Sequence, residues 1–283
     1  MLSDKILRHL REVGELPDLS ATRYQLIREI GRGGMGVVYL AHDTSLNRNV
    51  ALKILDQASE ACMLASLEHP GIVPVYETGI LPDGRVYYAM KFVRGTRLDD
   101  YHASTPSLAE PLHTFLRICE PVAFAHSRGV IHGDLKPENI MIGAWGDVLI
   151  LDWGIARRAN VPAAFAGGTD GYMAPEQLAG VTGPQTDIYS LGKVLEHLLS
   201  PPDPKSIRAI AAKAAHPDPS MRYAGVMELT AEIVRFLDGQ PVYAYQESWF
   251  ERVSRWISRN KTLTVLVMTY VVARTLIFFF THR

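Results

Sequence analysis

Residues 132–139 read HGDLKPEN, and this stretch brings a histidine, an aspartate, a lysine and an asparagine into eight positions. Gly133 and Pro137 disfavour a regular helix or strand, so the stretch is predicted to form a loop. A loop that gathers a carboxylate, an amine and an amide is typical of a chemical site. Taken alone, the same pattern is equally compatible with a polar turn between two strands.

Three side chains of this loop carry distinct chemistry. Asp134 can accept a proton, Lys136 can neutralise phosphate charge, and Asn139 can offer a neutral oxygen to a hard cation. Asp152 follows thirteen residues after Asn139, in the sequence LDWG at the end of an apolar run. It adds a second oxygen ligand.

The composition sets wide bounds on the class of protein. The chain has 283 residues and 47% hydrophobic content, which is enough for one large domain or two lobes around a cleft. A net charge of -1 gives no general attraction to nucleic acid. Cys62 and Cys119 lie far apart, without a disulfide or zinc pattern, which fits a reducing compartment.

A glycine-rich segment lies among short predicted strands. Gly31, Gly33 and Gly36 form G-x-G-x-x-G, and glycines at this spacing let a backbone lie close over phosphates. In a dinucleotide-binding fold this motif opens a helix. Here VVYLAHD continues the pattern of a strand, so the sequence favours a hairpin that covers phosphates.

Lys53 is the one charge in the apolar strand NVALKIL. A buried lysine needs a partner anion, whereas a lysine on an edge strand would simply face water. Glu60, Leu64 and Leu67 are spaced i, i+4, i+7 and share one helical face. Glu60 is therefore expected to reach back to Lys53.

The pattern of elements predicts two lobes. Short strands fill residues 24–93, helical segments dominate residues 94–240, and a cleft lies between them. A short amphipathic helix is expected in the N-terminal extension, residues 1–23. Met90 would lie at the back of a nucleotide pocket, with the backbone of residues 91–93 facing the purine edge.

Eight motifs occur in order: GRGGMGVV, VALK, EHPGIV, HGDLKPEN, LDWG, GTDGYMAPE, DIYSLG and HPDPSMRY. Together they resemble the eukaryotic-like (Hanks-type) serine/threonine protein kinases of bacteria, over roughly residues 24–240. The resemblance implies an α+β, two-lobed protein-kinase fold in trimmed form. It implies transfer of the γ-phosphoryl group of ATP to a serine or threonine hydroxyl of a protein, with ATP and Mg²⁺ as cofactors.

The resemblance also implies roles for the catalytic residues. Lys53, held by Glu60, would contact the α- and β-phosphates. Asp134 would orient the substrate hydroxyl and accept its proton, and Lys136 would offset charge on the transferred group. Lys136 within DLKPEN is similar to the serine/threonine type rather than the tyrosine type.

Metal and nucleotide ligands follow from the same resemblance. Asn139 and Asp152 would hold Mg²⁺. Val38, Ala51 and Met141 would sandwich the adenine. The full set of implied nucleotide-binding residues is Ile30, Gly31, Arg32, Gly33, Gly34, Met35, Gly36, Val38, Ala51, Lys53, Met90, Lys91, Val93 and Met141.

Two further family features are structural. Glu176 and Arg222 resemble a buried ion pair of the large lobe, and Asp187 resembles the helix residue that braces the catalytic loop. One departure concerns the position before Asp134, where the family usually has an arginine and this chain has Gly133.

The missing arginine commonly grips a phosphate on the activation segment. Residues 155–168 contain no serine, threonine or tyrosine, so acceptor and clamp are absent together. We therefore expect activity that does not depend on phosphorylation there. Only six residues separate Lys53 from Glu60, which keeps open the alternative of a pseudokinase or nucleotide-binding scaffold without turnover.

The last part of the chain reads as a membrane attachment. Residues 241–262 contain a basic amphipathic helix with tryptophans, and residues 263–280 form an apolar run long enough for a transmembrane helix. The expected partner is a lipid bilayer, and the expected location is the cell membrane with a single pass and the kinase in the cytoplasm. A buried helix or a dimer contact is the alternative.

Overall fold

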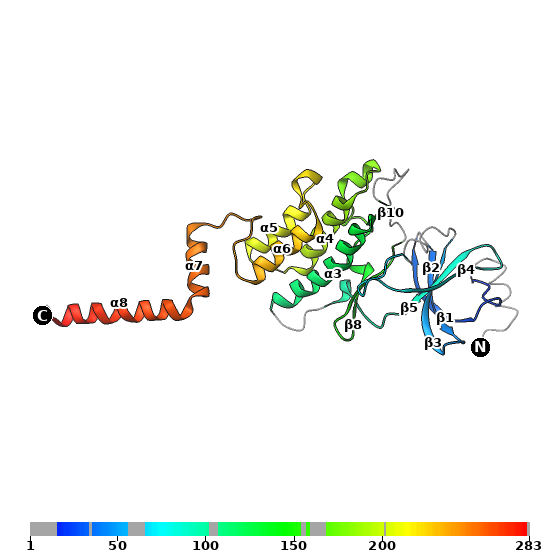
Figure 1. Cartoon of the computed structure of the whole chain (residues 1–283), viewed down its shortest axis with the longest axis horizontal. Helices are drawn as coiled ribbons and strands as arrows, with labels where there is room; N and C mark the ends of the chain where they lie inside the picture. The colour runs from blue at the N-terminus through cyan, green and yellow to red at the C-terminus, as the bar shows by residue number, and fades with distance from the viewer. Residues whose placement is uncertain are drawn as a thin grey trace.

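The computed structural model describes residues 16–33, 36–55, 66–101, 107–153, 157–158, 168–200 and 202–281. Figure 1 shows a lobe of strands beside a helical lobe, with the last two helices extending away from both. This arrangement agrees with the predicted two-lobed fold of a small β-rich part and a larger helical part. The predicted boundaries between these parts stay predictions.

The small lobe is one antiparallel sheet in the order β1-β2-β3-β5-β4. Its strands are β1 (Tyr24–Gly33), β2 (Gly36–Asp43), β3 (Arg48–Leu55), β4 (Val75–Ile80) and β5 (Val86–Lys91). Short connections join β1 to β2, β2 to β3 and β4 to β5, whereas β3 pairs with β5 across the 30 residues that separate them. Three of the four pairings are therefore local, and the sheet presents one face to the large lobe.

Alternation along β3 decides which side chains face the cleft. Leu52 and Ile54 belong to an outer apolar cluster, whereas Ala51 and Leu55 pack into the main core. Successive side chains of a strand point to opposite faces. Lys53 therefore shares the inner face with Ala51 and Leu55.

The large lobe is built around four helices: α3 (Ala109–Ser127), α4 (Pro184–Leu198), α5 (Lys205–Ala214) and α6 (Val226–Leu237). α4 contacts α5, and α3 contacts both α4 and α6. Phe115, Leu191, Ile210 and Ile233 lie at these contacts with no exposed surface. This packed helical core is the rigid support for the loops at the cleft.

Short elements complete the large lobe. They are β6 (Gly95–Arg97), η1 (Leu98–Asp100), β7 (Val130–Ile131), η2 (Pro137–Asn139), β8 (Ile140–Gly143), β9 (Val148–Ile150), β10 (Arg157–Arg158), η3 (Pro175–Ala179) and η4 (Pro219–Met221). β6, β8 and β9 form one small sheet, and β10 pairs with β7. The predicted loop at 132–139 lies between β7 and β8.

The prediction of a transmembrane helix at residues 263–280 is wrong. Across the part of the chain that the structure describes, no helix is both long and apolar enough to cross a membrane. α7 (Trp249–Arg259) is followed by α8 (Lys261–Thr281), and Arg274 and five threonines interrupt the apolar side chains of α8. A charge at mid-helix costs about 2.5–3.5 kcal/mol on insertion scales, and the prediction discounted this cost because Arg274 lies towards the far end of the run.

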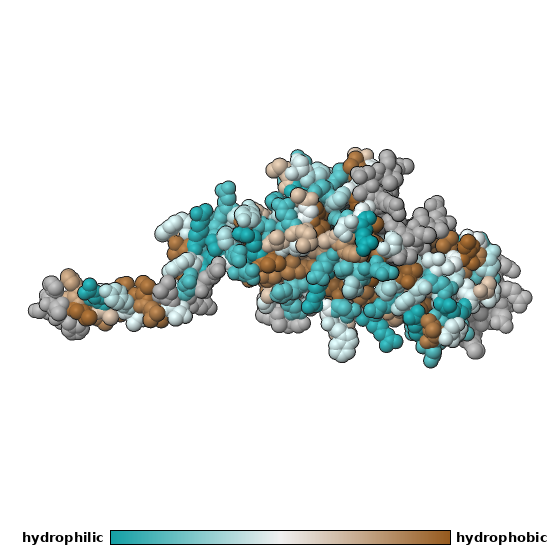
Figure 2. Space-filling model, in the orientation of Figure 1, coloured by the Kyte–Doolittle hydropathy of each residue, from teal (hydrophilic) through white to brown (hydrophobic). Residues whose placement is uncertain are grey.

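Hydrophobic side chains are nevertheless exposed along α8, and Figure 2 shows them as brown patches on this helix. The bilayer partner was expected on the strength of the spanning helix, and that support is gone. The cell-membrane location stays a prediction. At the other end, the helix expected in residues 1–23 lies mostly outside the described residues.

Candidate functional site: a phosphate-binding cleft

A cavity of about 570 Å³ lies between the two lobes. This volume is within the usual range for small-molecule sites. Of the predicted nucleotide-binding residues, the structure places these in its lining: Ile30, Gly31, Val38, Ala51, Lys53, Met90, Lys91, Val93 and Met141. The predicted metal ligands Asn139 and Asp152 line the same cavity. Apolar walls with oxygen ligands at one end suit a nucleotide.

The glycine segment is a hairpin, as its sequence context predicted. Gly33 pairs with Gly36 across β1 and β2, so the motif joins two strands and opens no helix. Gly36 has a φ of 128°, and a Cβ there would lie 2.1 Å from the carbonyl oxygen of Ile54. This close approach requires glycine. The hairpin residues Gly34 and Met35 lie outside the described part of the chain.

Arg32, Gly33 and Gly36 belong to the hairpin but not to the cavity lining. The Arg32 guanidinium instead donates two hydrogen bonds to the Glu29 carboxylate, at 2.7 and 2.9 Å. The cavity also has lining residues that the sequence did not indicate, among them Tyr88 and Glu138.

Lys53 and Asp152 form an ion pair across the cleft. Lys53 Nζ lies 2.5 Å from Asp152 Oδ1, although 99 positions separate the residues. Burial by itself would raise the pKa of Asp152, but the charge and hydrogen bond of Lys53 hold it below its usual value. Glu60, the predicted partner of Lys53, lies outside the described residues, so that contact stays a prediction.

Asp152 has a backbone φ of 53°, in the left-handed region. A non-glycine residue there is uncommon and costs of order 1–3 kcal/mol, so the surroundings must hold it in place. The carboxylate is 40% exposed, whereas the Lys53 side chain is 4% exposed. The ion pair therefore presents a reachable carboxylate on a strained backbone.

The loop 132–139 brings its predicted residues together. Lys136 Nζ lies 2.9 Å from Asp134 Oδ2 and donates a hydrogen bond of 2.5 Å to Thr169 Oγ1. Thr169 Oγ1 in turn donates to Asp134 Oδ1 at 2.9 Å. The carboxylate, the amine and the hydroxyl thus form one closed group beside the cavity, in the same loop as the lining residue Asn139.

Asn139 is tied to the same group by its amide nitrogen. Nδ2 donates to the carbonyl oxygen of Asp134 at 2.9 Å, so the amide oxygen is the atom on offer to a cation. With Asp152 this makes two oxygen donors, which suits Mg²⁺, because Mg²⁺ keeps several waters and takes its other ligands from phosphates. The described residues hold no cluster of three or more His, Cys, Asp or Glu side chains placed to ligate a metal.

Asp187 braces the loop from α4. Its fully buried carboxylate accepts hydrogen bonds from the backbone nitrogens of His132 at 2.9 Å and Gly133 at 2.8 Å. His126 Nε2, at the end of α3, lies 2.7 Å from the same carboxylate. Burial opposes the charged form, but these contacts, led by His126, lower the pKa of Asp187 below its usual value. The sequence predicted Asp187 in this role but gave no signal for His126, 61 positions away.

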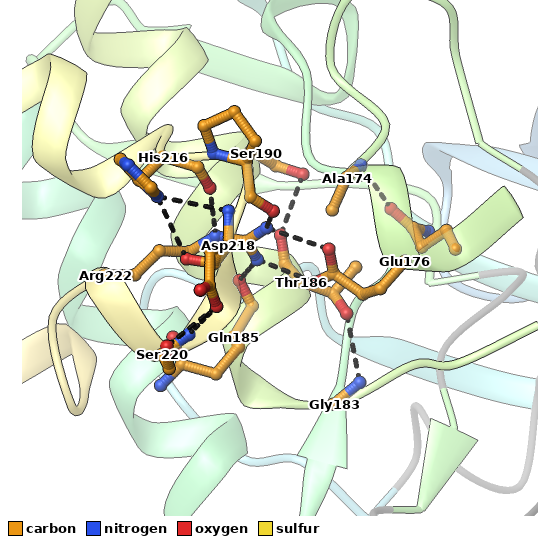
Figure 3. Close-up of polar contacts among 12 residues, drawn as sticks. Ala174, Glu176, Gly183, Gln185, Thr186, Ser190, His216, Asp218, Ser220 and Arg222 are labelled. Atoms are coloured by element: carbon orange, nitrogen blue, oxygen red, sulfur yellow. Dashed lines mark hydrogen bonds and ion pairs between the residues drawn. The ribbon is translucent and has the colours of Figure 1, made fainter. Parts of the chain in front are cut away.

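The predicted ion pair of the large lobe is also present. Arg222 donates to both carboxylate oxygens of Glu176, at 2.6 and 2.8 Å, and Figure 3 shows the polar contacts around it. Its other hydrogen bonds go to the backbone carbonyl oxygens of His216, Gln185 and Pro217. The pair lies away from the cavity and joins η3 to the segment around η4.

A two-lobed fold, a glycine hairpin, and a lysine, two carboxylates and an amide at one cleft define a phosphoryl-transfer class of protein. The family model described as "Protein kinase domain" matches residues 24–223. The chain therefore belongs to the protein kinase family, and its kinship with the bacterial Hanks-type serine/threonine kinases is confirmed.

Similar curated proteins include "Serine/threonine-protein kinase PknD" of Chlamydia felis, 34% identical over 295 residues, with 77% of this chain and 31% of the relative covered. The protein of that name from Chlamydia trachomatis serovar D is 34% identical, covering 77% and 32%. The one from Protochlamydia amoebophila is 39% identical over 225 residues, covering 62% and 23%. The chain spans about a third or less of the length of these relatives.

Proposed function

We propose that this chain is an ATP- and Mg²⁺-dependent protein kinase that phosphorylates serine or threonine hydroxyls of a protein substrate. The observation that carries the proposal is the closed group of Asp134, Lys136 and Thr169 beside the cavity that holds Lys53 and Asp152. The family and the names of the related kinases support the same reaction.

Each residue has a task that its position suits. The substrate hydroxyl oxygen forms a bond to the γ-phosphorus, while the bond from that phosphorus to the β–γ bridging oxygen breaks and ADP leaves. Asp134 accepts the hydroxyl proton, and Lys136 offsets the charge on the transferred group. Lys53 holds the α- and β-phosphates at the inner end of the cavity.

Mg²⁺, when bound, supplies charge neutralisation at the phosphate oxygens. Asn139 and Asp152 are the residues that would hold it. Val38, Ala51 and Met141 give the cavity the apolar surfaces that an adenine ring fills. Lys91 and Val93 line the same cavity, and backbone groups of residues 91–93 would bond the purine edge.

The test compares the purified chain with Asp134→Asn, using γ-labelled ATP, Mg²⁺ and a generic protein acceptor. We expect label in acid-stable phosphoserine or phosphothreonine with the wild type and at least a hundredfold less with the variant, because proton acceptance contributes about 10²–10⁴-fold. Asp147→Asn, an exposed aspartate in the turn after β8, is the matched control and should keep full activity. Wild-type labelling no higher than that of Asp134→Asn would leave a nucleotide-binding scaffold instead.

A further inference from the structure

Gln177 is a fully buried amide in η3 that lies outside the cavity lining. Its Nε2 donates to the carbonyl oxygen of Gly133 at 2.8 Å, and its Oε1 accepts from the backbone nitrogen of Ala174 at 2.8 Å. One side chain therefore joins the loop 132–139 to the residues that follow the activation segment. A buried amide is costly unless it is hydrogen-bonded, so these contacts hold it in one orientation.

The carbonyl of Gly133 belongs to the peptide group that leads into Asp134. The nitrogen of the same peptide group, on Asp134, donates to His132 Nδ1 at 3.2 Å. Both ends of this peptide plane are thus held, one by Gln177 and one by His132. A peptide group is planar, so hydrogen bonds at both its oxygen and its nitrogen fix the orientation of the plane. They therefore also fix the direction in which the backbone enters Asp134.

Gly133 is held on its other side as well, since its own nitrogen donates to Asp187 Oδ1 at 2.8 Å. Its φ of 79° is a conformation that glycine adopts without strain. With no side chain at position 133, the contacts made there are to backbone atoms. The contact that reaches this position from η3 is therefore the amide of Gln177.

We propose that Gln177 is a positioning residue for Asp134. It couples η3, which follows the activation segment, to the carboxylate that accepts the substrate proton, and it does so through neutral hydrogen bonds. Residues 155–168 carry no hydroxyl group and so offer no site for a phosphate. The Gln177 contact links η3 to the loop 132–139 without one. The inference rests on the proposed function for its kinetic consequence, but its geometric consequence can be measured without turnover.

The first experiment measures kinetics on the full chain carrying Gln177→Met, which keeps the unbranched shape and removes both hydrogen bonds. We expect kcat to fall about 10- to 100-fold, the usual effect of losing a contact that orients a reacting group. The KM for ATP should stay within about twofold, because Gln177 does not line the cavity. Gln177→Glu should give a loss of the same order, because a carboxylate oxygen then faces the Gly133 carbonyl.

Gln185→Met is the matched control. Gln185 Nε2 also donates to a backbone carbonyl oxygen, that of Tyr223 at 3.0 Å, in the same lobe but away from the loop 132–139. We expect its kcat to equal that of the wild type. An unchanged kcat in Gln177→Met, an equal loss in Gln185→Met, or a raised KM with unchanged kcat would each overturn the proposal. So would thermal unfolding of both Gln177 variants below the assay temperature, since the role would then be structural.

The second experiment is amide hydrogen exchange on the peptide that contains residues 132–136. Gln177→Met should exchange about five- to tenfold faster there than the wild type, because the peptide group that carries the Asp134 amide loses the hydrogen bond that holds its Gly133 carbonyl, and Gln185→Met should not. This result stands even if the wild type transfers no phosphate, so failure of the proposed function and failure of the positioning role are told apart. Equal exchange in both variants would overturn the positioning role.

Discussion

Two ion pairs of this molecule join opposite charges at similar distances but are built differently. Arg222 has a fully buried side chain that donates five hydrogen bonds, two of them to Glu176. Lys53, at the cleft, makes a short contact with one oxygen of Asp152, whose side chain is 40% exposed. The first pair is saturated and closed, and the second leaves a carboxylate open to the cavity.

The difference shows where a charge is used to hold the fold and where it is available for chemistry. A saturated guanidinium has no donor left for a ligand, so Glu176 and Arg222 can only connect η3 to the segment around η4. Asp152 keeps an oxygen for a cation and is held in a strained backbone conformation. Burial alone does not separate the two pairs, because Lys53 and Arg222 are both buried.

The largest effect is expected from Arg222→Met. Removing the guanidinium leaves the Glu176 carboxylate unpaired at an exposure of 15% and strands three backbone carbonyl oxygens. Breaking a buried pair in this way costs about 3–5 kcal/mol of the free energy of unfolding. Denaturant unfolding measures it, with Arg208→Met, an exposed arginine on α5, as the control that stays within about 0.5 kcal/mol. A loss below 1 kcal/mol would mean that the saturated pair is not structural.

Lys53→Met should reduce activity strongly and stability only slightly, in contrast to Arg222→Met. We expect phosphoryl transfer to fall about 10²–10³-fold, as when one preorganised charge partner of a reacting group is removed. The free energy of unfolding should change by less than about 1 kcal/mol, because water can solvate the exposed oxygen of Asp152. Kinetics and denaturant unfolding on the same preparation test both halves. A stability loss as large as that of Arg222→Met would erase the distinction between the pairs.

The two pairs also differ in how well the sequence alone predicted them. Glu176, Arg222 and Asp187 could be assigned before the fold was known, because each sits in a motif whose spacing is typical of the family. The contact between Lys53 and Asp152 could not, since it depends on how the end of β9 approaches β3. Helical spacing indicated Glu60 as the partner of Lys53, and spacing reports only local neighbours.

The omitted residues share this cause, whereas the membrane error has a different one. Gln177 and His126 carry no local signal, because their importance comes from backbone atoms or a carboxylate far along the chain. The membrane prediction for residues 263–280 weighed a run of apolar residues and gave too little weight to Arg274. Hydropathy of a segment describes its composition, whereas crossing a bilayer requires the whole helix to be apolar over its length.

Asp187 provides a test through pH. Its pKa is lower in the folded chain than the value of about 3.9 of an unfolded aspartate. Its contribution to stability is therefore present above that pH and is lost as the pH falls through the folded pKa. We expect the free energy of unfolding to drop on acidification below about pH 4, and the drop to be smaller in Asp187→Asn. If the free energy of unfolding fell equally with pH in the two proteins between pH 5 and pH 2, the contacts of the Asp187 carboxylate would not stabilise the fold.

The smallest effect is expected from Lys193→Gln. Lys193 and Glu196 lie one turn apart on α4 and form an ion pair with side chains 30% and 40% exposed. Such a pair contributes less than about 0.5 kcal/mol, because water screens it and ordering two long side chains costs entropy. Denaturant unfolding should therefore barely distinguish the variant from the wild type. This result would show that opposite charge alone stabilises little here, and that the effect of Arg222 comes from burial and five hydrogen bonds. A loss above 1 kcal/mol would instead mean that exposure does not separate weak pairs from strong ones in this fold.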